Sequence, residues 1–100
     1  MAKKNNIYIN RTVTKSITDS PFEINFLTEK GTFANTLTIK GCDKTIGVKF
    51  NDLLNDEIEI IGKSDAEFDP FILSSLQINK LYLVIKENTT TVKLYLAGRL

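Results

Sequence analysis

The sequence predicts a small all-β domain, an antiparallel β-sandwich or barrel of the jelly-roll or immunoglobulin-like type, with about seven short strands. Its composition is that of strands, because 12 Ile, 11 Thr and 4 Val stand against only 4 Ala. Apolar and polar residues alternate in short stretches, and turn-forming residues interrupt them at intervals typical of a sandwich. With 42% hydrophobic residues, a chain of this size supports one modest core. We therefore expect a single domain over residues 7–100, preceded by a flexible basic arm at residues 1–6.

The expected strands follow one another closely along the chain. The first covers residues 7–17, where Arg11 and Lys15 share the apolar face. Such inward charge predicts an interrupted strand or one at a sheet edge, where it discourages the addition of another strand. Residues 51–56 fit a loop or one helical turn, and residues 71–78 fit a strand entry or one helical turn. Further strands are predicted at 22–26, 33–40, 46–50 and 58–61, with turns at 18–21, 29–32 and 41–44.

The strongest pattern lies near the C-terminus, where residues 81–86 and 91–96 flank the polar stretch 87–90. This arrangement predicts a β-hairpin with a four-residue turn. One face of this hairpin is wholly aliphatic and is expected in the core; it comprises Leu81, Leu83, Ile85, Val92, Leu94 and Leu96.

The other face of the predicted hairpin carries Tyr82, Val84, Lys93 and Tyr95. Tyrosine is enriched at protein interfaces, so these four residues are a candidate interface. The alternative is that both faces of the strands are covered, as in the centre of a sheet, because such strands also show near-continuous apolar runs.

Several kinds of chemistry are disfavoured. The chain has no histidine, which removes the commonest general base, the Ser-His and Cys-His nucleophile pairs and most zinc sites. A catalytic site would depend on carboxylates such as Glu57 and Glu59, and a small β domain rarely forms the deep pocket that they need. The single cysteine, Cys42, excludes an internal disulfide and is expected to be structural. We expect no enzyme activity and no cofactor.

Residues 51–69 hold seven acidic residues and one basic residue. Within them Asp65, Glu67 and Asp69 form a candidate acidic segment that would dock on a basic surface, with a solvated loop as the alternative. Three alternating carboxylates also suit Ca²⁺, but the glycine and the downstream glutamate of an EF-hand loop are missing. No metal site is therefore expected.

The formal net charge of +1 argues against a broad surface for nucleic acid. No stretch has the length of a membrane span, and no apolar signal core follows the N-terminus, so synthesis in the cytoplasm is expected. An alternative function is a ligand-binding β module for carbohydrate or, in the manner of an OB-fold, for single-stranded nucleic acid. The aromatic residues that would serve it are Tyr8, Phe22, Phe26 and Phe33.

In length, Ile/Asn/Lys/Thr-rich composition, basic N-terminal arm, lack of histidine and apolar C-terminal strands, the chain is similar to small all-β bacteriophage virion proteins. These include capsid decoration proteins, head fibres and head–tail or baseplate modules. The resemblance implies a non-enzymatic structural protein that forms homo-oligomers or docks on a capsid lattice. It also implies that the arm, with Lys3 and Lys4, becomes ordered against a protein partner in the assembled virion.

Overall fold

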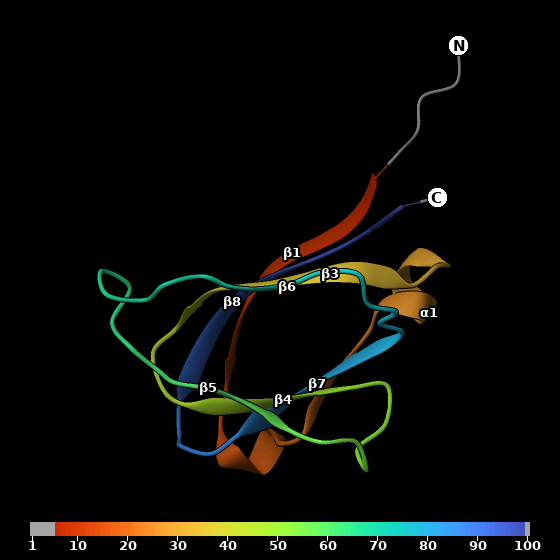
Figure 1. Cartoon of the computed structure of the whole chain (residues 1–100). Helices are drawn as coiled ribbons and strands as arrows, with labels where there is room; N and C mark the ends of the chain where they lie inside the picture. Colours follow the sequence, from red (N-terminus) through yellow and green to blue (C-terminus); the bar gives the residue numbers. More distant parts are fainter. Residues whose placement is uncertain (1–5, 100) are drawn as a thin grey trace.

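The computed structural model describes residues 6–99, which form two four-stranded antiparallel sheets packed face to face (Figure 1). The sequence prediction of a small β-sandwich is therefore confirmed. Residues 6–99 contain eight strands, one more than the seven expected, because residues 71–78 also contribute a short strand. The strands are β1 (Asn6–Lys15), β2 (Phe22–Asn25), β3 (Ala34–Cys42), β4 (Ile46–Phe50), β5 (Ile58–Ile60), β6 (Phe71–Leu73), β7 (Lys80–Ile85) and β8 (Thr90–Arg99).

The topology is that of a jelly roll. The first sheet has the order β1-β8-β3-β6 and the second the order β2-β7-β4-β5. Strands of the first half of the chain thus pair with strands of the second half: β1 with β8, β2 with β7, β3 with β6 and β4 with β5. This is the pairing of one long antiparallel ribbon rolled into a sandwich, and β8 then also pairs with β3 while β7 pairs with β4.

The prediction of a C-terminal hairpin is wrong, because β7 and β8 belong to different sheets. The chain crosses from one sheet to the other through residues 86–89 instead of turning back within a sheet (Figure 1). The alternating pattern does not distinguish a hairpin from two strands in opposite sheets. In a hairpin the aliphatic faces lie side by side, and in a sandwich they face each other across the core.

The aliphatic face predicted for these strands is buried, as expected. Its six members are at most 3% exposed and come from both sheets. Each of the two strands has a neighbour on both sides within its own sheet. The remaining core includes Ile9, Val13, Ile24, Phe26, Ala34, Leu37, Ile39, Cys42, Ile46, Val48, Ile60 and Ile78.

Strand β1 lies at the edge of the first sheet, as its inward charges predict. The strand is continuous and ends at Lys15, two residues earlier than expected, before a 3₁₀ helix at Ile17–Asp19. Arg11 is held by Glu29, with 2.8 Å between Nη2 and Oε1, and this pairing lowers the pKa of the Glu29 carboxyl. The Lys15 ammonium lies 4.4 Å from the centre of the Phe22 ring. Both charges therefore have partners inside the chain.

A short helix replaces the turn predicted at residues 29–32. Helix α1 (Phe26–Lys30) begins directly after β2, with the Asn25 side chain accepting a hydrogen bond from the Thr28 amide. It ends at Gly31, whose φ of 78° is in the left-handed region that glycine tolerates best. Phe26 was predicted as a strand residue and instead anchors this helix in the core, where it is fully buried.

Candidate binding surfaces

The four residues of the predicted interface do not form one surface. Tyr82 and Val84 lie on the outer face of the second sheet, while Lys93 and Tyr95 lie on the outer face of the first, because β7 and β8 are in different sheets. Tyr82 is paired with residues of β2 and β4 on either side and is only 8% exposed. It therefore has little surface left for a partner.

Tyr95 has a different environment, beside a second aromatic ring. Its ring stacks on that of Tyr8, with 5.8 Å between the ring centres and 28° between the planes. Tyr8 comes from the edge strand β1 and is 53% exposed. Next to Tyr95 in the register stands Asn10, whose Oδ1 accepts a hydrogen bond from the Lys40 ammonium. The outer face of the first sheet thus carries an aromatic pair beside polar groups, in which Tyr8 is exposed and Tyr95 is half-buried.

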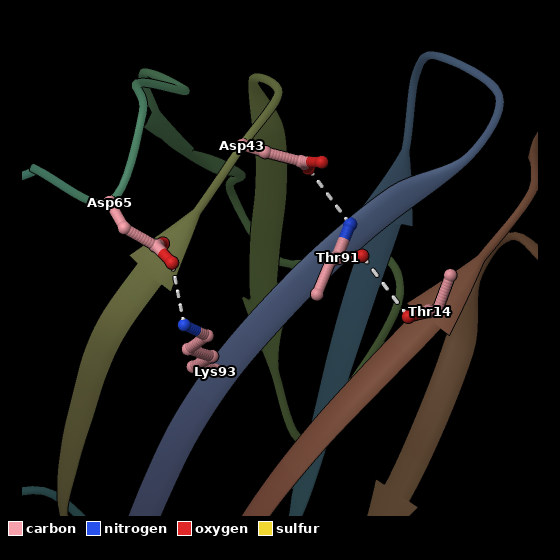
Figure 2. A network of polar contacts seen from close by, with 5 residues as sticks. All are labelled: Thr14, Asp43, Asp65, Thr91 and Lys93. Atoms are coloured by element: carbon pink, nitrogen blue, oxygen red, sulfur yellow. Dashed lines mark hydrogen bonds and ion pairs between the residues drawn. The ribbon is translucent and has the colours of Figure 1, made fainter.

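Lys93 is engaged within the chain by one of the predicted acidic residues. Figure 2 shows its ammonium directed toward Asp65, with 2.7 Å between Nζ and Oδ2. In the same region, Asp43 Oδ1 accepts a hydrogen bond of 2.8 Å from the Thr91 amide. The hydroxyls of Thr91 and Thr14 lie 3.1 Å apart. These contacts fasten the segment after β5 and the turn after β3 to the first sheet.

The three residues of the predicted acidic segment point to different places. Asp65 pairs with Lys93, while Glu67 accepts a hydrogen bond from the Ser64 hydroxyl. Asp69 instead lines a surface hollow. Within residues 6–99, no group of three or more potential ligand residues is arranged to hold a metal ion. All three residues are exposed, and the docking of this segment on a basic surface stays a prediction.

A third ion pair, after Arg11–Glu29 and Lys93–Asp65, lies on the outer face of the second sheet. Lys86 Nζ is 2.6 Å from Glu57 Oε2, and this contact raises the pKa of the Lys86 ammonium. The Glu57 side chain lies over Gly47 of β4, where a Cβ atom would overlap it. Glu57 and Glu59 are the carboxylates considered for catalysis. Glu59 lies in the edge strand β5, Glu57 directly precedes that strand, and both are exposed.

Two leucines stand in solvent in the loop between β4 and β5. Leu54 is 93% exposed and Leu53 is 41% exposed. No role was predicted for them, although two leucines among Asn and Asp residues are a visible signal in the sequence. Single exposed apolar residues are common on protein surfaces, so the way in which the loop is held is what distinguishes this pair.

The chain holds this loop with a dense set of hydrogen bonds. Asn51 has a φ of 68°, and its side chain accepts hydrogen bonds from the amides of Asn79 and Lys80. The Asp52 carboxylate accepts a hydrogen bond from the Leu54 amide, and the Asn55 side chain donates to the Phe50 carbonyl. The positive φ and these side-chain contacts define one loop conformation, in which the leucines point away from the core.

A shallow hollow of about 180 Å³ lies at the other end of β5. Its lining combines four apolar residues with three charged ones, and Ile61, one of the apolar residues, is 56% exposed. In Figure 1 the loop after β4 and the segment between β5 and β6 lie at opposite ends of the sandwich. The residues that line the hollow are Glu59, Ile60, Ile61, Lys63, Phe68, Asp69 and Phe71.

Cys42 is a core residue, as expected for a structural thiol. It is 1% exposed, and its Sγ donates to the Lys44 carbonyl over 2.7 Å. Burial raises the pKa of the Cys42 thiol to about 11, because the interior disfavours the charged thiolate. The protonated thiol is therefore the stable form in the folded protein.

This raised pKa predicts a pH dependence of stability. Between pH 9 and about 11, the unfolded chain loses the Cys42 proton while the folded chain keeps it, so unfolding releases a proton. The free energy of unfolding should therefore fall as the pH rises through this window, and the fall should be smaller in Cys42→Ala. Urea titrations of both proteins at several pH values measure the difference. Parallel pH profiles for the two proteins would contradict the prediction.

Within the described residues, no helix has the length and apolarity needed to cross a membrane. Lys3 and Lys4 of the predicted arm lie outside the described residues, and Asn6, assigned to the arm, begins β1. In comparisons with known proteins, no family model, no curated protein and no solved structure matches the chain.

Proposed function

We propose that this protein is a non-enzymatic assembly component, of the kind found in bacteriophage particles, that joins to further copies of itself. The observation that carries the proposal is the Leu53–Leu54 loop, which presents apolar side chains in a defined conformation. Holding an apolar side chain in its bound conformation beforehand lowers the entropic cost of association. The jelly-roll fold supports the proposal only by analogy, since capsid domains share it with lectins and cupins.

The same chain offers a partly apolar receptor for this loop. The hollow is lined by Ile61, Phe68 and Phe71. The segment between β5 and β6, which supplies most of its lining, lies at the end of the sandwich opposite to the loop after β4 (Figure 1). A projection at one end and a recess at the other make a heterologous, head-to-tail contact. Such contacts produce closed rings or open filaments, depending on the rotation between neighbours, and both are forms that a structural component adopts.

Charge sets the conditions for this contact. The loop carries Asp52 and Asp56, and the hollow carries Glu59 and Asp69 together with Lys63. Like charges therefore approach one another when the loop meets the hollow, and salt screens this repulsion. We expect association to be stronger at 0.5 M than at 0.05 M salt, the opposite of an interface that oppositely charged groups hold together.

Sedimentation velocity over a range of concentrations tests the proposal. The unmodified protein should associate reversibly, and Leu54→Ser should weaken the association at least about tenfold, because it removes the apolar side chain that enters the recess. Ile17→Ser is the matched control, since Ile17 is 47% exposed and lies outside both surfaces. If the protein stays strictly monomeric up to about 1 mM, its binding free energy is weaker than about 4 kcal/mol. That result would refute self-association.

Mixing two variants tests the head-to-tail arrangement itself. Leu54→Ser keeps an intact hollow, and Ile61→Ser keeps an intact loop. Each variant alone should remain monomeric, while an equal mixture should form dimers and nothing larger, because only one intact contact can form per pair. Failure of the mixture to form dimers, with the unmodified protein still associating, would place the contact elsewhere on the molecule.

A further inference from the structure

The outer face of the first sheet has a chemistry distinct from that of the assembly loop. Along this face an exposed aromatic ring, Tyr8, stands beside Tyr95. The register places the side chains of Asn10 and Thr38 on either side of Tyr95, and Thr36 lies across Ala97 from Tyr8. Thr12 follows Asn10 on the same face of β1. Hydroxyl, amide and aromatic groups therefore share one open sheet surface.

We infer that this face binds a neutral, linear oligosaccharide, with Tyr8 as the stacking platform. A sugar ring presents C–H groups, which carry partial positive charge, to the negative face of an aromatic ring. Its hydroxyls both donate and accept hydrogen bonds, as do the Thr hydroxyls and the Asn amide beside the tyrosines. The surface thus offers both kinds of contact that a sugar needs.

The Tyr8–Tyr95 stack prepares the platform in advance. Tyr95 contacts one side of the Tyr8 ring at 5.8 Å between centres, and 53% of Tyr8 is still exposed. A ring that its neighbour already orients loses less conformational freedom on binding. The residues of this face do not line the hollow, and the face itself is open. An open face suits an extended chain of several sugar units, whereas a single small molecule is usually bound in a concave pocket.

Charge favours an uncharged ligand over nucleic acid. The cations on this face whose side chains the structure describes are Lys40 and Lys93, and both are occupied: Lys40 donates to Asn10, and Lys93 pairs with Asp65. Binding of single-stranded nucleic acid depends on a positively charged groove that follows the phosphates. The described part of this face offers no such row of free cations, whereas a neutral glycan requires none.

Nuclear magnetic resonance titration with neutral hexasaccharides tests the inference; cellohexaose, mannohexaose, laminarihexaose and chitohexaose are suitable probes. At least one should shift backbone amide signals in residues 8–12, 36–38 and 95–97. Tyr8→Ala should weaken its binding at least tenfold, while Tyr8→Phe should retain most of it, because the ring and not the hydroxyl makes the stack. Tyr82→Phe, in the other sheet, should leave binding unchanged.

Three results would overturn the inference. The first is the absence of any shift with all four hexasaccharides at several millimolar. The second is a set of shifts outside this face. The third is tighter binding of an oligothymidylate than of every sugar at the same residues, which would assign the face to single-stranded nucleic acid. Leu54→Ser should bind the sugar normally, so this test and that of self-association succeed or fail separately.

Discussion

Phe26→Ala is expected to lower the free energy of unfolding by about 3–5 kcal/mol, the usual cost of removing a fully buried phenylalanine. Phe26 is among the largest side chains in the core and is fully buried. It also begins helix α1, so its loss removes the contact that anchors the helix against the sandwich. Small domains are stable by about 5–15 kcal/mol, and the change should be clear in urea denaturation followed by circular dichroism.

The next residue in the chain provides the matched control. Leu27 lies in the same helix and is 44% exposed. Leu27→Ala removes less buried surface and introduces the best helix former, so the free energy of unfolding should change by no more than about 1 kcal/mol. Equal effects of the two substitutions would mean that helix α1 does not insert Phe26 into the core as described.

Gly62→Ala should be the second strongly destabilising substitution, by about 1–3 kcal/mol or more, because its Cβ would overlap backbone atoms of Lys44. Backbone packed on backbone cannot move aside without breaking other contacts. Here the Gly62 amide donates to the Thr45 hydroxyl, and the Lys63 amide donates to the Cys42 carbonyl. These bonds fasten the segment after β5 to the β3–β4 turn.

Gly47→Ala is the control for this prediction. A Cβ at Gly47 would also overlap an existing group, but that group is the end of the Glu57 side chain. The carboxylate can rotate away, at the cost of its exposed pair with Lys86, which contributes about 1 kcal/mol or less. Thermal unfolding should therefore show a much smaller shift for Gly47→Ala than for Gly62→Ala. The reverse order would contradict the close approach at Gly62.

The strands could be predicted well because their signal is local. The alternation of Ile, Val, Leu and Phe with polar residues located the strands, and Arg11 and Lys15 marked β1 as an edge strand. Helix α1 was missed because a helix of five residues shows too little of the 3.6-residue period to be recognised. Asn25 as its cap and Gly31 at its end were the available signals.

The candidate surfaces were harder to predict, because they depend on which strands share a face. The predicted hairpin placed Tyr82 and Tyr95 on one face, whereas the fold separates them and stacks Tyr95 on Tyr8, far away in the sequence. Lys93 and Asp65 were assigned to two different surfaces and instead pair with each other. The separation of Tyr82 from Tyr95 follows from the wrong pairing of β7 with β8, whereas the Lys93–Asp65 contact depends on where the segment after β5 lies.

By itself, the sequence determined that the chain is a small all-β domain, a sandwich or a barrel, which side chains of its C-terminal strands enter the core, and that histidine chemistry is excluded. Alternation along a strand shows which side of the strand is apolar, and this can be read from neighbouring residues alone. Only the tertiary structure decided that β7 and β8 face each other across the core, that Leu54 stands in solvent, and that Tyr8 joins Tyr95. Strand partners are chosen by contacts between distant segments, and a period of two residues is the same whichever neighbour a strand acquires.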